Sequence, residues 1–222
     1  MNLKRLPALL RRPPLNSVVP VLALVHRLVN RRWWDEDKIT AAYEPAPALN
    51  PAPDAQTIGD GVGDALTRRY DIDLHAAPRT PRQVLEEFRQ HPDRFSPTSY
   101  AAFGTAELET GDRFTIELAG PWNGPVEVAE VSDSRIRLVT LDGHMEAGYI
   151  DFCAVENAQR RVLRIESTAR AGDPGFWLLH DALPIGRWVQ TDMWARVLEK
   201  AATAAGLPAP PQVHVRTVRH RE

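Results

Sequence analysis

The chain has 222 residues, with 27 basic and 29 acidic side chains, 43% hydrophobic residues and one cysteine. This length accommodates one full-sized domain with extensions. A single cysteine excludes an internal disulfide framework and any multi-cysteine zinc or iron–sulfur site, and the ordinary balance of charged and hydrophobic residues argues against wholesale disorder and a polytopic membrane protein.

The net charge of -2 is unevenly distributed along the chain. Residues 1–34 carry seven Lys or Arg and no acid, residues 207–222 have a net charge of +2, and the remainder therefore has a net charge of -11. Nucleic acid is not expected as the main partner, because phosphate binding requires a basic face. The basic ends leave contact with an anionic membrane open as an alternative.

The first thirty residues lack the pattern of an export signal. The apolar run Leu6–Leu10 stops at two arginines and two prolines, and Val18–Val25 is about half of the ~20 residues that a membrane span needs. A cytoplasmic location is the expectation that follows.

Residues 1–63 are predicted to form a basic helical extension and a linker. Apolar residues recur at helical spacing from Val18 to Val29, after Asn16 or Ser17 as N-cap. This amphipathic helix either docks on the main domain or lies on a membrane, and Trp33 and Trp34 suit both readings. The proline-rich residues 43–55 are typical of an extended linker, and residues 59–64 indicate a turn rather than a phosphate loop.

Residues 64–206 are predicted to form the folded domain. Strands are expected at 69–76, 101–108, 114–118, 126–131, 136–141, 148–155 and 161–170, because apolar residues alternate there between turn residues. Thr80 with Pro81 indicates the start of a helix, and a long apolar stripe predicts a last helix from Pro184 to Gly206. The fold class is therefore α+β, with a curved antiparallel sheet wrapped around a long C-terminal helix. Residues 207–222 are expected as a basic, proline-containing tail.

This element order resembles the helix-grip superfamily of START and Bet v 1 type (SRPBCC) domains. Within it, residues 140–152, Thr-Leu-Asp-Gly-His-Met-Glu-Ala-Gly-Tyr-Ile-Asp-Phe, are similar to a Leu-Pro-Gly-His-Pro-Glu-x-Gly-Glu-x-x-Phe signature of the bacterial domain of unknown function 1990 family. Asp142 and Met145 stand where that signature has prolines, and Tyr149 replaces an acidic residue. The resemblance implies the fold and a ligand cavity between sheet and helix, and it names no reaction.

The strongest candidates for proton transfer are His144 and Glu146. Residues at i and i+2 of a strand share a face, so the carboxylate could raise the pKa of the imidazole for acid or base catalysis. The Asp142–Gly143 turn signal, however, places His144 at a sheet rim rather than in the cavity. Arg164 is a third candidate catalytic residue.

Two further groups favour structural roles. Asp71, Asp73 and His75 share one face of the first predicted strand, which is the pattern of a metal face and equally of a solvated face. Cys153 lies in an apolar strand without a partner thiol and indicates a small core residue. No metal or other cofactor is expected.

Aromatic residues are the candidates for ligand contact, because small-molecule cavities are mostly apolar and aromatic. Phe176 and Trp177 precede the last helix, where the resemblance implies the cavity mouth. The full set of candidate ligand-binding residues is Trp122, Phe176, Trp177, Trp188 and Trp194.

Three hypotheses about function remain. The first is the binding of a hydrophobic small molecule, as a carrier or sensor. The second is an enzyme of cyclase or dehydratase type on the same scaffold, with protons moved by His144, Glu146 or Arg164. The third is a peripheral membrane or protein-docking module that uses residues 1–34. An ionisable pair that faces the cavity would favour the enzyme hypothesis. A cavity wall that is almost wholly apolar would favour the carrier hypothesis. Neither a reaction nor an oligomeric state follows from the sequence.

Overall fold

The structure is a computed structural model that describes residues 33–41, 52–97, 101–118, 124–177 and 185–220. The amphipathic helix predicted within residues 18–29 lies outside this range, as do most of the residues predicted for membrane contact.

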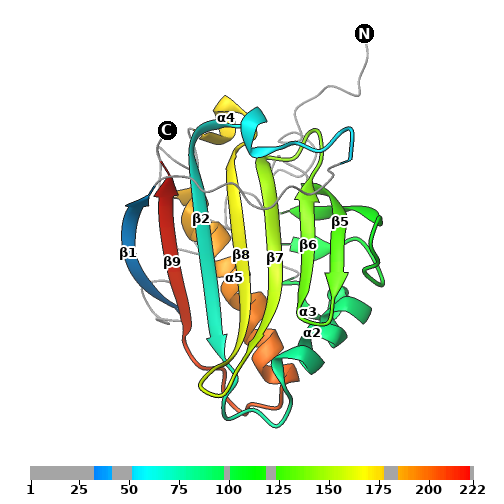
Figure 1. Cartoon of the computed structure of the whole chain (residues 1–222), viewed down its shortest axis with the longest axis vertical. Helices are drawn as coiled ribbons and strands as arrows, with labels where there is room; N and C mark the ends of the chain where they lie inside the picture. The colour runs from blue at the N-terminus through cyan, green and yellow to red at the C-terminus, as the bar shows by residue number, and fades with distance from the viewer. Residues whose placement is uncertain (1–32, 42–51, 98–100, 119–123, 178–184, 221–222) are drawn as a thin grey trace, which may run out of the picture.

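The described residues form one nine-stranded sheet (Figure 1). The strands lie in the order β1-β9-β2-β8-β7-β6-β5-β4-β3, and every neighbouring pair is antiparallel except β1 and β9, which are parallel. Their bounds are β1 (Trp33–Ala41), β2 (Val62–Asp73), β3 (Ala101–Phe103), β4 (Arg113–Leu118), β5 (Gly124–Ser132), β6 (Arg135–Thr140), β7 (Glu146–Glu156), β8 (Arg161–Ala171) and β9 (Val213–His220). Strands β3 to β8 follow the chain as a meander, as the short turns predicted.

The described helices are short, apart from the last. They are the 3-10 turn η3 (Ile58–Asp60), α2 (Pro81–Gln90), α3 (Pro92–Phe95), α4 (Pro174–Trp177) and α5 (Ile185–Ala204). The N-cap predicted at Thr80 is present, because the Thr80 hydroxyl accepts from the backbone N–H of Gln83 while the Gln83 side chain accepts from the N–H of Thr80.

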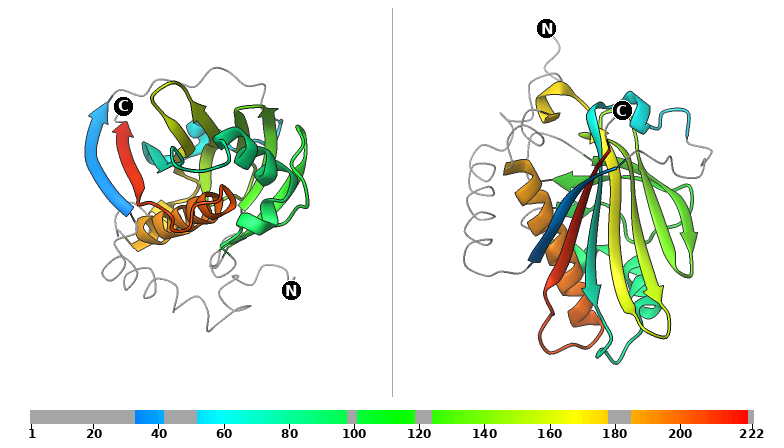
Figure 2. Two further views of the ribbon diagram at one scale, coloured as in Figure 1. Left: turned by 90° about the horizontal axis from the view of Figure 1, so that it is seen from below. Right: turned by 60° about the vertical axis from the view of Figure 1, so that its left-hand side comes forward.

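The sheet bends into an arc, and α5 lies on its inner side (Figure 2, left). We call the side facing α5 the inner face and the opposite side the outer face. Because side chains alternate along a strand, Leu66, Tyr70 and Ile72 of β2 point inward with the core, whereas Asp71 points outward. The inner face, α2 and α5 enclose a core in which Phe88 contacts the rings of Phe95, Phe103 and Phe152.

The expected C-terminal tail is instead part of the sheet. Strand β9 pairs with β2 and β1, and its Val213 and Val215 are buried in the core. The prolines before it bring the chain from α5 back to the sheet and do not mark the end of the fold. The folded body therefore continues past residue 206.

The expected N-terminal extension and linker also contribute structure. Residues 33–41 form β1, and Ala55 makes an isolated β-bridge to Leu141. The Asp54 carboxylate binds the Arg113 guanidinium through two hydrogen bonds of 2.9 and 3.0 Å. Strand β2 begins at Val62, before the predicted boundary at residue 64, whereas β3 is only three residues long rather than the predicted eight.

Candidate ligand-binding site

A small cavity of about 40 Å³ lies between α5 and the inner face of strands β4 to β8. Most of its described wall is apolar, and a few polar side chains meet at one end. The apolar part includes Ile116, Leu118, Val126, Leu138, Ile150, Ala169, Met193 and Trp194, and the polar part is Thr140, His144, Glu146, Ser167 and Gln190. This volume holds water but not an organic ligand, so ligand binding requires the cavity to enlarge.

Helix α5 supplies one side of the cavity. Gln190, Met193 and Trp194 line it because residues at i, i+3 and i+4 share a helix face. The Trp194 ring packs edge-on against Phe152, with 5.8 Å between ring centroids. Its indole nitrogen, Nε1, is buried without a hydrogen-bond acceptor among the described residues. Trp194, one of the sequence-based candidates for ligand contact, thus lies on the cavity wall and carries a donor without an acceptor among the described residues.

His144 lies in the β6–β7 turn and also lines the cavity, which differs from the rim position inferred from the turn signal. Strand β7 begins at Glu146, so the two residues do not share a strand face. Instead, the His144 Nδ1 accepts the backbone N–H of Glu146 at 2.9 Å. Burial lowers the pKa of His144 and outweighs the nearby Glu146 carboxylate, which was expected to raise it. Nδ1 also lies 3.0 Å from the Glu146 carbonyl oxygen, and the lowered pKa favours the uncharged form of the ring.

Two polar residues hold this turn in place. The Gln56 side chain donates to the carbonyl of His144 at 3.3 Å, and its backbone N–H donates to the carbonyl of Thr140 at 2.8 Å. The Thr140 hydroxyl accepts the N–H of Gly148 at 2.9 Å and lies 2.9 Å from the Gln56 carbonyl. A segment expected to be linker therefore positions His144.

The polar end contains a buried charge network that sequence reasoning missed. Gln190 Nε2 donates to both Glu146 carboxylate oxygens, at 3.0 and 3.1 Å, and Gln190 Oε1 accepts from the Arg68 guanidinium at 2.5 Å. Arg68 also donates to the Thr191 hydroxyl at 2.5 Å and is only 4% exposed. The amide of Gln190 thus joins a buried cation to a carboxylate. The sequence contained one indication of this network. Arg68 lies between Leu66 and Tyr70 on the face of β2 that is otherwise apolar, so a buried charge could have been expected there.

Arg164 lies on the outer face, away from the cavity. Its Nε and Nη2 atoms donate to the two Asp71 oxygens at 2.7 and 2.8 Å. The bound carboxylate raises the pKa of the Arg164 guanidinium, which therefore remains charged. In this position Arg164 does not line the cavity, so its predicted role in proton transfer there gains no support from the structure.

The other aromatic candidates lie apart from the cavity or outside the described residues. Phe176 is buried in α4, and Trp177 is 38% exposed, with its ring against the backbone of Gly63. Trp188 is half-buried on α5 and is not among the described residues that line the cavity. Trp122 is not described. The expectation that Phe176 and Trp177 are the leading ligand contacts gains no support from this placement.

The candidate metal face does not assemble. Asp71 binds Arg164, and an Asp73 oxygen accepts the backbone N–H of His75 at 2.6 Å. Across the described part of the chain, no three His, Cys, Asp or Glu side chains lie close enough to hold a metal ion.

Cys153 is half-buried, and burial raises the pKa of its thiol to about 11. Because the thiolate is the reactive form, at pH 8 the folded protein should react with a disulfide reagent about two orders of magnitude more slowly than an unperturbed thiol. The rate, followed by absorbance, should rise steeply toward pH 11 and become normal in guanidinium chloride. Rapid reaction of the folded protein at pH 8 would contradict the shifted pKa.

No protein-family model and no curated protein matches the sequence. Among solved structures, the chain is similar to protein Ms6760 from Mycobacterium smegmatis, with 13% identity, a TM-score of 0.43, and coverage of 69% of this chain and 96% of that one. It is also similar to DynU16, a putative protein of the dynemicin biosynthetic locus, with 14% identity, a TM-score of 0.40, and coverage of 65% of this chain and 48% of that one. The chain thus spans about half of DynU16. None of the described helices is long and apolar enough to cross a membrane.

Proposed function

We propose that this protein binds a hydrophobic small molecule between the curved sheet and α5, as a carrier or sensor, and that its fold is a helix-grip variant. The supporting observation is the cavity wall, in which apolar side chains from several strands and from α5 surround one polar end. Such a wall, with few polar groups, is typical of small-molecule sites.

Ligand entry requires enlargement of the cavity. Met145 and Met193 line it, and their unbranched side chains change rotamer at low cost. We therefore expect a ligand to displace these side chains and to shift the beginning of α5.

The test compares two substitutions that add equal volume. Ala169→Leu places a larger side chain in the cavity, whereas Ala154→Leu places it on the same sheet face outside the described cavity wall. We expect native mass spectrometry to detect an apolar adduct on the unmodified protein, and Ala169→Leu to weaken its binding by about tenfold relative to Ala154→Leu.

Melting temperatures of both variants show whether the substituted proteins remain folded. Equal loss of binding in the two variants would place the ligand elsewhere. A clean protein mass, together with no thermal shift across a panel of lipids and polyketides, would count against the proposal.

A second candidate function is a cyclase or dehydratase reaction in the same cavity. The observation that favours it is that His144 and Glu146 both line the cavity, and that an uncharged imidazole lies beside a carboxylate. Incubating a captured ligand with the protein and with Glu146→Gln, followed by mass analysis, separates the two functions. A carrier returns the ligand unchanged in both cases, whereas an enzyme alters it only when Glu146 is present.

Membrane or protein docking through residues 1–34 stays a prediction, as does a cytoplasmic location. Only Trp33 and Trp34 of that segment are described, at the start of β1.

A further inference from the structure

The polar end of the cavity has no net charge. The Arg68 guanidinium and the Glu146 carboxylate balance each other through Gln190, and His144 is uncharged. In this network the Gln190 carbonyl faces the cation and its NH₂ group faces the carboxylate, which is the orientation that satisfies both charges. A ligand that brought a further charge to this place would leave that charge unbalanced in a buried site, which is costly.

The same end has unused hydrogen-bonding capacity of both kinds. Among the described side chains, the hydrogen bonds observed to the Glu146 carboxylate come from Gln190. Each carboxylate oxygen accepts more than one hydrogen bond, so both oxygens can accept further donors. On the cavity wall, the buried Trp194 Nε1–H has no acceptor among the described residues, and the imidazole of His144 also lines the cavity. A hydroxyl group donates one hydrogen bond and accepts others, and so matches this set.

We propose that the cavity selects uncharged ligands that carry a hydroxyl group, which donates to Glu146 and accepts from Trp194. This inference rests on the proposed function and adds the polar group that the ligand presents. Carboxylates are disfavoured because Glu146 repels them, and ammonium groups are disfavoured because Arg68 already balances Glu146.

The test uses four probes of similar size, namely toluene, phenol, benzoate and benzylamine, titrated at neutral pH and followed by nuclear magnetic resonance of the tryptophan indole N–H groups. We expect phenol to bind at least about tenfold more tightly than toluene, benzoate or benzylamine. Phenol should also shift the Trp194 indole resonance, which Trp194→Phe identifies by its loss.

Variants that remove one of the two charges should change which ligand the cavity prefers. Glu146→Gln leaves the Arg68 charge unbalanced, so benzoate should gain about tenfold over phenol, and Arg68→Met should favour benzylamine in the same way. Glu109→Gln changes an exposed carboxylate away from the cavity and serves as the control. If Arg68→Met does not fold, Glu146→Gln alone still decides the question.

The outcomes distinguish this inference from the proposed function. Tight toluene binding without a preference for phenol, and without a change in benzoate affinity in Glu146→Gln, would overturn the selection by charge while leaving a hydrophobic site. Failure of all four probes, toluene included, to perturb any indole resonance or the melting temperature would overturn both.

Discussion

Replacing Gly148 by Ala is expected to lower the free energy of unfolding by about 4 kcal/mol, at the upper end of single-substitution effects. Gly148 has a φ angle of +156° and pairs with Ala169 of β8. An added Cβ would lie 2.8 Å from the Ala169 Cα and even closer to the Thr168 carbonyl oxygen, which is backbone that cannot rotate away. Strand β7 would have to separate from β8. Urea denaturation followed by circular dichroism measures the loss.

Gly143 provides the matched control. It has a φ angle of +89° in the turn before β7, but an added Cβ there meets no atom within 4 Å. Gly143→Ala therefore tests the backbone conformation without the collision, and should cost only about 1 kcal/mol. Similar losses in the two variants would show that the close approach of β7 and β8 is not what makes Gly148 necessary.

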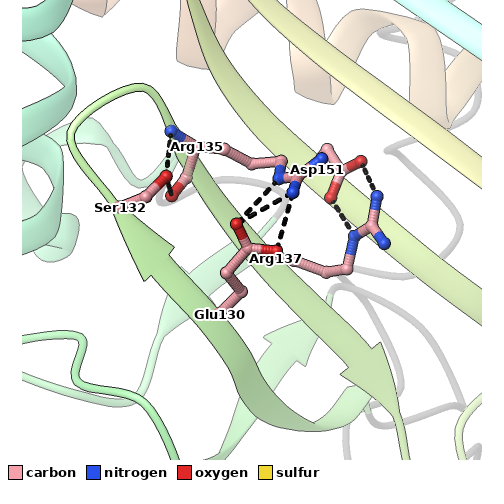
Figure 3. A network of polar contacts seen from close by, with 5 residues as sticks. All are labelled: Glu130, Ser132, Arg135, Arg137 and Asp151. Atoms are coloured by element: carbon pink, nitrogen blue, oxygen red, sulfur yellow. Dashed lines mark hydrogen bonds and ion pairs between the residues drawn. The ribbon is translucent and has the colours of Figure 1, made fainter. Parts of the chain in front are cut away.

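Replacing Asp151 by Asn should cost about 3 kcal/mol, because it leaves a buried cation without its carboxylate. Arg137 of β6 donates to both Asp151 oxygens at 2.5 Å, and these side chains are only 6% and 8% exposed (Figure 3). The Arg137 guanidinium also lies 4.5 Å from the Tyr149 ring centroid, and in the folded protein the Asp151 carboxylate raises its pKa. Arg137 stays charged in the variant even without this carboxylate, because an arginine side chain is not deprotonated in proteins.

The double variant Arg137→Met with Asp151→Leu should recover most of this loss, because apolar side chains of similar size carry no desolvation penalty. The neighbouring ion pair of Arg135 and Glu130, also in Figure 3, is more exposed, so Glu130→Gln should change the urea midpoint little. If Asp151→Asn and Glu130→Gln lower the urea midpoint equally, burial does not determine how much an ion pair contributes to stability.

Much of the sheet follows from local sequence patterns. The alternation from Val126 to Val131 predicted β5 within about two residues, because one face of this strand is buried. The apolar run from Ile136 to Leu141 predicted β6 within one residue, and this strand is buried on both faces. Strand β9 was missed although Val213 and Val215 alternate with polar residues in the same way. The three prolines before it indicated the end of a domain, and partners as distant as β1 and β2 leave no local signal.

The site was less predictable than the fold. His144 and Glu146 were identified as a pair, but the prediction had them interact as side chains on a strand, whereas the actual contact is between the imidazole and the Glu146 backbone. Gln190 has no motif, and its role depends on Arg68, which is 122 residues away in the chain. Interactions at such separations follow from topology, so only the position of Arg68 on an apolar face could have suggested them.

The order in which the strands are synthesised differs from the order in which they pair. Strand β1 is the first described strand to be made, and β9, its neighbour in the sheet, is the last. While the ribosome translates the meander and α5, one edge of β2 has no partner strand, and such an edge promotes aggregation. Completion of the sheet must therefore wait until β9, the last described strand, has been synthesised.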